Sequence, residues 1–475
     1  MIYNNFSNEN NDYLKFILNE RFFKTWKTPF IKTLNNEYDR SLHSDSRLEL
    51  YITAKCNQKC EYCYLHKHEN QLYPINNDNP EKIIENLKIL LNFLIENNFF
   101  ISTLDLFSGE IWHTKFGWDI LEIIYEACLN GLNINEVLIP SNCSFIRDEQ
   151  AFFKIQNLID KFAGINKRLG FSISVDGKII EEDNRPLNSN ENKNDDFYDL
   201  LFGFSAHNGF GFHPMLAAHS IEKWIDNYNW YKAQCEKYNI NFFKNVMILE
   251  VRNDDWTSEK LKYYKKFLEY YFYDLKNSFP KDLQIQELMN CLFYDSANSF
   301  LGDGYHPIAL PESDTFASCT VADTLTIRLG DLAICPCHRL AYDELLYGHF
   351  IVEENKITDI IANNIYTPTR ILLANNNLTS FKCDACVYNQ YCLKGCFGSQ
   401  YETVKDPFLP INSVCEMYKT KINTLIDLYK QNKLIDELEK CPPTHIYYVT
   451  SQSFLRFVKE VEQNENNQFY KQNFS

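Results

Sequence analysis

The chain has 475 residues, enough for roughly two to three domains. Hydrophobic residues make up 45% and charged residues 23%, which excludes collagenous, disordered and small disulfide-rich classes. With 47 basic and 63 acidic residues, the net charge of −16 argues against nucleic acid as a partner. The sequence shows no secretory signal and no run of about 18 apolar residues, so we expect a cytoplasmic protein that does not bind a membrane.

Strands and helices alternate regularly after an aromatic, Asn-rich stretch over 1–47, which we expect to form a short helical cap. Period-two apolar patterns predict six strands, over 48–54, 102–107, 135–141, 170–176, 211–217 and 242–251. Helical periodicity follows each strand, from Asn79-Pro80 and over about 117–130, 148–162, 195–206, 220–237 and 257–275. Six such units in series predict an α/β fold with a parallel sheet, either open or a partial barrel. In these folds the chemistry lies at the carboxyl ends of the strands.

The alternation stops after about residue 300, and the stretch 319–415 is dense in cysteine. Short segments rich in cysteine are typical of a domain organised around metals. We therefore expect four parts: a cap over 1–47, the strand–helix domain over 48–300, a small cysteine-rich domain over 301–420 and a helical segment over 421–475.

The sixteen cysteines are clustered, with three in 56–63 and eight in 319–415. Reduced cytosolic thiols with this spacing indicate metal or iron–sulfur ligation. The first cluster, Cys56, Cys60 and Cys63, follows the first predicted strand in the pattern CxxxCxxC. Three thiolates from one loop can hold three irons of a [4Fe–4S] cube and leave the fourth iron open. The alternative is a zinc knuckle, which usually presents CxxC pairs and four ligands.

This motif, with the aromatic Tyr62 before its last cysteine, resembles that of the radical S-adenosylmethionine (SAM) enzymes. The resemblance covers about residues 48–275 and implies a partial (β/α)6 barrel that binds SAM at one [4Fe–4S] cluster. Ser108-Gly109-Glu110, after the second strand, is similar to the Gly-Gly-Glu motif of the family, although Ser108 replaces the first glycine. By the same resemblance the SAM-binding residues include Tyr62, Ser108, Gly109, Glu110, Asn142, Ser172, Ser174 and Arg185. The planar guanidinium of Arg185 suits a carboxylate.

The later cysteines resemble the SPASM extension of radical SAM enzymes that modify peptides. Their spacing is Cys319-x10-Gly330-x4-Cys335, then Cys383-x2-Cys386-x5-Cys392-x3-Cys396, with Cys415 after eighteen more residues. The resemblance implies two auxiliary [4Fe–4S] clusters, an outer one on Cys383, Cys386, Cys392 and Cys415 and an inner one on Cys319, Cys335 and Cys396. The usual fourth inner ligand is replaced by Ser313. The inner cluster therefore either keeps an open iron or recruits another ligand, for which Cys337 is the obvious candidate, or Cys337 takes the place of Cys335; the sequence leaves these alternatives open.

The resemblance implies an enzyme that cleaves SAM reductively to a 5′-deoxyadenosyl radical, which abstracts hydrogen from a ribosomally made precursor peptide. The product would be a crosslink, a thioether or an epimer. The partners would be an electron donor such as flavodoxin or ferredoxin and a separate leader-binding protein, because few residues precede the barrel. Alternatives are formylglycine formation of the sulfatase-maturase kind, a small-molecule substrate, or a zinc-organised interaction protein without catalysis. The sequence identifies no catalytic acid or base.

Overall fold

The structure is a computed structural model, in which the chain divides into two compact units. The first unit comprises 1–251 and 321–373, and the second comprises 252–320 and 374–475. The residues that the structure describes are 47–74, 77–186, 194–278, 324–363, 381–384, 386, 388, 395–431, 455 and 458–459. The helical cap expected over 1–47 and most of the expected helices after 430 lie outside these residues.

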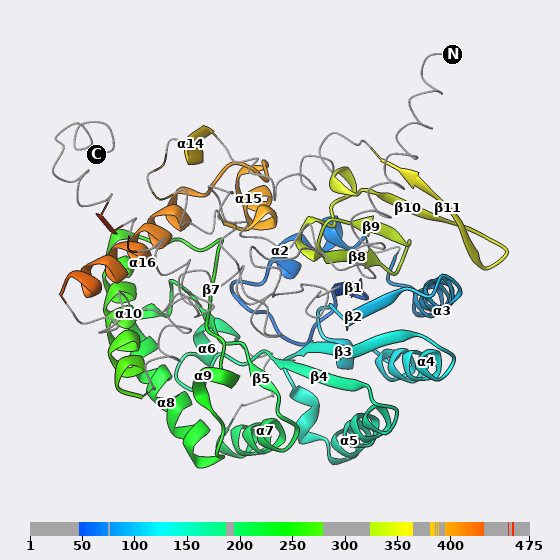
Figure 1. Cartoon of the computed structure of the whole chain (residues 1–475), viewed down its shortest axis with the longest axis horizontal. Helices are drawn as coiled ribbons and strands as arrows, with labels where there is room; N and C mark the ends of the chain where they lie inside the picture. The colour runs from blue at the N-terminus through cyan, green and yellow to red at the C-terminus, as the bar shows by residue number, and fades with distance from the viewer. Residues whose placement is uncertain are drawn as a thin grey trace, which may run out of the picture. The chain divides into compact units, whose positions relative to one another are not determined.

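A nine-stranded sheet organises the first unit, in the order β11-β10-β9-β8-β1-β2-β3-β4-β5 (Figure 1). Five of its parallel strands are β1 (Arg47–Tyr51), β2 (Phe100–Asp105), β3 (Asn133–Ser141), β4 (Arg168–Ile173) and β5 (Gly211–Phe212). A separate parallel pair consists of β6 (Met215–Leu216) and β7 (Leu249–Glu250). The expected parallel α/β sheet is therefore confirmed, and the carboxyl ends of its strands lie along one edge.

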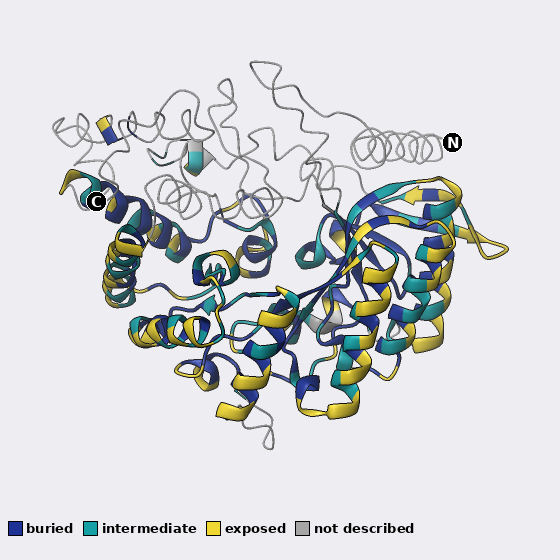
Figure 2. Cartoon of the chain, turned by 60° about the horizontal axis from the view of Figure 1, so that its bottom comes forward, coloured by how far each residue is buried: buried dark blue, intermediate teal, exposed yellow. Residues whose placement is uncertain are grey.

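Helices follow the strands and lie along the outer side of the sheet in Figure 1. They are α3 (Pro80–Glu96), α4 (Gly117–Leu129), α5 (Glu149–Gly164), α7 (Asp195–Asn208) and α8 (Trp224–Lys237). Asn79 caps α3 by accepting from Glu81 N at 3.0 Å, and Asp148 caps α5 in the same way. Figure 2 shows these helices buried on one side and exposed on the other, as their periodicity predicted.

Shorter helices and turns connect this framework, and none of them was predicted as a separate element from the sequence. Helix α2 (Tyr64–Leu72) begins directly after Cys63, where the sequence has no continuous apolar stripe. The remaining short elements are α6 (Glu181–Asn184), α9 (Phe242–Asn245) and the 3-10 turns Ile111–His113, Ser144–Arg147, Ile221–Lys223, His338–Leu340 and Asp343–Leu345.

The fifth and sixth predicted strands differ from the structure. The segment 211–217 is split into β5 and β6 at His213-Pro214, because proline has no N–H to donate to a strand ladder. The prediction of one strand over 242–251 was wrong, since 242–245 forms α9. Asn241 caps that turn by accepting from Lys244 N at 3.2 Å, which favours a helix start over an extended chain.

Residues 324–362 extend the same sheet, although the sequence analysis assigned them to a separate domain. Strand β8 (Thr324–Arg328) pairs with β1 in parallel, and β9 (Ala333–Cys335), β10 (Gly348–Glu353) and β11 (Lys356–Ala362) follow as antiparallel neighbours. A hydrophobic pattern can indicate a strand but not the strand with which it pairs. Pairing between residues 277 positions apart leaves no local signal in the sequence.

The second unit contains α10 (Ser258–Ser278), α14 (Phe381–Asp384), α15 (Phe397–Val404) and α16 (Asn412–Lys430). Helices α10 and α16 are joined by an ion pair from Lys265 to Asp427 at 2.7 Å. The domain boundary expected at 420 falls inside α16, whose buried stripe runs unbroken from Val414 to Leu428. Among the residues that the structure describes, no helix has the length and apolarity that a membrane crossing requires.

Candidate functional site

The loop after β1 carries Cys56, Cys60 and Cys63, and all three side chains are half-buried. The backbone turns tightly, with Cys63 N donating to Cys60 O at 3.0 Å and Gln58 N donating to Cys56 Sγ at 3.4 Å. Burial raises the pKa of Cys56 to about 12, and the negative charges of Glu110, Cys60 and Cys63 add to the effect. The three thiols therefore lie close enough to influence one another, as the CxxxCxxC motif predicted.

The donor set fits a cluster better than a single ion. No three Cys, His, Asp or Glu side chains of the described residues lie close enough to hold one metal ion. A [4Fe–4S] cube binds each thiolate at a different iron, so its ligands stand further apart. The buried polar atoms that have no hydrogen-bond partner among the described residues include three from the predicted site and its cysteine loop: Gln58 Nε2, Ser108 Oγ and Arg185 Nε. Because buried polar atoms are nearly always bonded, these are the atoms that a polar ligand would satisfy.

The segment Phe107–Glu110 continues the sheet beyond β2. Gly109 N donates to Thr53 O at 2.7 Å and Glu110 N donates to Lys55 O at 2.8 Å. A Cβ atom on Gly109 would lie 2.3 Å from Lys55 O and 2.5 Å from Ala54 O. Glycine is therefore required here so that this segment can approach the chain entering the cysteine loop.

We expect Gly109→Ala to lower the free energy of unfolding by about 1–3 kcal/mol, because backbone atoms rather than a flexible side chain must give way. Urea unfolding of the whole chain measures this loss. The matched control is Gly164→Ala at the end of α5, where a Cβ atom meets nothing within 4 Å and stability should be unchanged or slightly higher. Equal stability of the two variants would contradict the close approach at Gly109.

The carboxylate of Glu110 joins the ends of β2 and β3. It is buried and accepts from Ser141 Oγ at 3.0 Å and from Asn142 N at 2.8 Å. The Asn142 side chain in turn donates to Asn57 Oδ1 at 2.8 Å, inside the cysteine loop. The structure thus brings Glu110 and Asn142 together beside the cysteines, as the sequence predicted.

Arg185 lies at a buried carboxylate that the sequence analysis did not identify. Its guanidinium donates to Asp176 Oδ1 at 3.0 Å, and Tyr62 Oη donates to Asp176 Oδ2 at 2.8 Å. Asp176 also accepts from Asn184 at 2.9 Å and from Met215 N at 2.8 Å. Burial raises the pKa of Tyr62 well above its usual value, so it acts as a neutral donor. Two predicted residues, Tyr62 and Arg185, therefore both donate to Asp176 after β4. The Asp176-Gly177 pair is the feature of the sequence that could have revealed this carboxylate.

The two serines of β4 have different surroundings. Ser172 Oγ lies 2.8 Å from His213 Nδ1, which comes from the break between β5 and β6. Burial, with Arg47 and Arg185 nearby, lowers the pKa of His213 to about 4, so its imidazole is neutral. Ser174 is half-buried just beyond the strand, and its N–H donates to Ser141 O at 2.8 Å.

A second buried carboxylate, Glu49 on β1, was also missed by the sequence analysis. It accepts from Thr326 on β8 and lies 3.0 Å from His338 Nδ1. Burial raises the pKa of Glu49, but His338, Arg47 and Thr326 outweigh it and bring the pKa to about 2. The imidazole of His338 stacks on Phe107 with ring centroids 3.8 Å apart. An ionised carboxylate, Glu49, and His338 therefore lie beside Phe107, the residue directly before the Ser108-Gly109-Glu110 segment.

The later cysteines are only partly within the described residues, which exclude Cys319, Cys392 and also Ser313. In the first unit Cys335 is fully buried in β9, and Cys337 is half-buried two residues later. In the second unit Cys415 lies close enough to Cys383 and Cys386 for their charges to affect its pKa, which burial raises. The half-buried Cys396 precedes α15 in the same unit. Three of the four cysteines expected at the outer cluster are thus near one another.

The fold is similar to that of solved structures of anSMEcpe. Native anSMEcpe with bound AdoMet and Cp18Cys peptide matches with a TM-score of 0.53 and 16% identity, over 82% of this chain and 99% of that chain. Native anSMEcpe with bound AdoMet matches over the same shares with a TM-score of 0.51 and 16% identity. No family model and no curated protein sequence matches the chain. The likeness shows a shared fold across most of both chains.

Proposed function

We propose, from a fold shared with radical SAM enzymes that carry a SPASM domain, that this chain is a radical SAM enzyme that modifies a peptide. When bound, the [4Fe–4S] cluster on Cys56, Cys60 and Cys63 would reduce SAM to methionine and a 5′-deoxyadenosyl radical, which takes hydrogen from the peptide. The chain supplies binding, orientation and exclusion of water. A cytoplasmic location belongs to this proposal, because the cluster cysteines must stay reduced.

One observation carries the proposal: residues that follow three neighbouring strands, β2, β3 and β4, contact the cysteine loop after β1 or the chain that enters it. Asn57 in the loop is bonded to Asn142 after β3, and Glu61 N donates to Asn184 O, beside Arg185, at 2.9 Å. Gly109 and Glu110 pair with the chain that enters the loop. Polar residues without a role are mostly exposed, whereas Glu110, Asn142 and Asn184 are buried and hydrogen-bonded.

The residues suit the two charged ends of the SAM methionine moiety. Glu110 is a buried carboxylate next to the loop, which would attract an ammonium group. Arg185 would attract a carboxylate through the buried Nε that has no partner among the described residues, while Asp176 accepts from its Nη2. The centre of the Tyr62 ring lies 5.5 Å from the Arg185 guanidinium, so the aromatic ring covers part of this cation.

The substrate class is a peptide, and two kinds of reaction compete. AdoMet is bound together with the Cp18Cys or Kp18Cys peptide in solved structures of similar fold, which favours a sulfatase-maturase-like reaction as the second candidate. We favour maturation of a ribosomal peptide, because Ser313 replaces a cluster thiol and the arm before the barrel is longer than a sulfatase maturase would need. An electron donor such as flavodoxin and a separate leader-binding protein complete this proposal.

Metal and sulfide analysis after anaerobic purification and reconstitution tests the proposal. We expect about twelve irons per chain with matching sulfide, which corresponds to three [4Fe–4S] clusters. The control is the same analysis for zinc, which binds the same thiolates. Zinc with little iron would overturn the radical enzyme and favour a zinc-organised interaction protein.

A further inference from the structure

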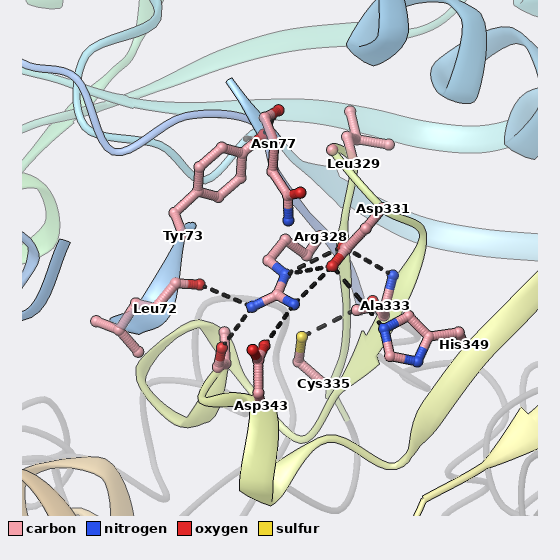
Figure 3. A network of polar contacts seen from close by, with 12 residues as sticks. Leu72, Tyr73, Asn77, Arg328, Leu329, Asp331, Ala333, Cys335, Asp343 and His349 are labelled. Carbon is pink, nitrogen blue, oxygen red and sulfur yellow. Dashed lines mark hydrogen bonds and ion pairs between the residues drawn. The ribbon is translucent and has the colours of Figure 1, made fainter. Parts of the chain in front are cut away.

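Arg328, at the end of β8, is one of the largest fully buried side chains of the described residues. All five N–H donors of its guanidinium are used (Figure 3). Its acceptors are Leu72 O at 3.2 Å, Ala341 O at 2.9 Å, Asp343 Oδ1 at 2.8 Å and both oxygens of Asp331 at 2.6–3.2 Å. A buried cation so fully bonded fixes every segment that it contacts.

The segments that meet at Arg328 are far apart in sequence but chemically related. Leu72 ends α2, the helix that begins directly after the Cys56–Cys63 loop. Asp331 lies in the turn before Cys335, and Ala341 and Asp343 follow Cys337. The guanidinium therefore joins the helix behind the first cysteine loop to both ends of the Cys335–Cys337 segment.

The turn between β8 and β9 has its own contacts with the chain after α2. A Cβ atom on Gly330 would lie 2.5 Å from Asn77 O, so only glycine allows this backbone approach. Asn86 on α3 donates to Leu329 O at 2.6 Å. Gly330 is the glycine of the Cys319-x10-Gly330-x4-Cys335 spacing, so the sequence motif has a packing reason at this point.

We propose that Arg328 is a positioning residue that holds the Cys335–Cys337 segment in the geometry needed to bind the inner auxiliary cluster, in fixed relation to α2. The inference rests on the proposed function as far as the cluster is concerned. Arg328 contacts the ligand segment from both sides without being a ligand. The planar guanidinium is essential, because a lysine ammonium at the same place has only three donors and cannot make the bidentate contact with Asp331.

The test compares Arg328→Lys with the wild type in the whole reconstituted chain. We expect hydrogen exchange to become at least tenfold faster in 333–345 and in the last turn of α2, with β2, β3 and β4 unchanged. We also expect a loss of about four irons per chain together with the electron paramagnetic resonance signal of one auxiliary cluster, while the signal of the SAM-binding cluster stays. The control is Lys356→Ala on β11, whose exposed ion pair with Glu96 should affect neither readout.

A second variant covers the case in which Arg328→Lys fails to fold. Asp343→Ala removes one acceptor whose side chain is 68% exposed, so the chain should fold normally. It should still shift the reduction potential of the inner cluster and speed hydrogen exchange in 338–345. Unchanged exchange in both variants, or in Asp343→Ala alone if Arg328→Lys is unfolded, would overturn the positioning role. If the wild type holds zinc instead of iron, the proposed function fails, while the exchange comparison still decides the role of Arg328.

Discussion

Replacing Cys56, Cys60 and Cys63 together by alanine is expected to reduce 5′-deoxyadenosine formation to the uncatalysed background. The three thiols come from one half-buried loop and lie within electrostatic reach of one another, so no remaining ligand set would hold the cluster. The auxiliary clusters should stay, because none of the three replaced cysteines belongs to their expected ligand sets and Cys383, Cys386 and Cys415 of the outer one lie in the second unit. Product analysis by chromatography under reducing conditions, with iron per chain measured on the same sample, checks both statements.

The matched control for this triple variant is Cys128→Ala. Cys128 is also half-buried, but it lies on α4 and belongs to neither cysteine group. We expect this variant to keep both the iron content and the formation of 5′-deoxyadenosine. Continued SAM cleavage by the triple variant would show that the barrel loop does not hold the reactive cluster.

Asp176→Asn is expected to lower the free energy of unfolding by about 3–5 kcal/mol, because it leaves the buried Arg185 guanidinium without its counter-charge. The side chain of Asp176 is 0% exposed and that of Arg185 is 7% exposed, so water cannot replace the lost interaction. The new amide also places an NH2 group where one carboxylate oxygen stood, so that it faces either the donors of Tyr62 and Asn184 or those of Arg185 and Met215. SAM binding should weaken as well, because Asp176 fixes the position of Arg185, the residue that we propose binds the SAM carboxylate.

Urea unfolding at neutral pH and titration with SAM measure these two effects. The control is Asp183→Asn on α6, which breaks an exposed ion pair with Lys223 and should change stability by less than about 1 kcal/mol. A decrease in the free energy of unfolding of less than about 1 kcal/mol in Asp176→Asn would mean that the contacts of Tyr62, Asn184, Arg185 and Met215 do not depend on this carboxylate.

The parts of the fold that sequence predicted best are those with a complete local signal. The helix α3 has a cap at Asn79, a proline in its first turn and an apolar stripe, and it begins where expected. Of the strand expected over 242–251, the end pairs with β6 as β7, whereas Asn241 caps the first four residues as α9. The pairing of β8 with β1 joins residues about 277 apart and could not be read from either segment alone.

In the candidate site, too, the residues with a local sequence signal were predicted and the others were not. Glu110, Asn142 and Arg185 were expected from the resemblance of the segments after the predicted strands to radical SAM motifs, and parallel strands bring such segments together at one edge of the sheet. Asp176 and His213 were missed, since their roles depend on which side chains face them across the sheet. Glu49 was missed because a charged residue in a strand ordinarily indicates an exposed face, whereas here it turns inward to Thr326 and His338.

The pairing of β1 with β8 also affects the order of events during synthesis. Because Glu49 and its partner Thr326 are 277 residues apart, β1 remains an edge strand for about 15–55 s at typical rates of translation. During that time one side of β1 presents unpaired backbone groups that invite association with other chains. The arrival of β8 removes this edge and also brings Arg328 to the end of α2. The late-made strand thus completes the first one, and a chain truncated before residue 324 would be prone to aggregate.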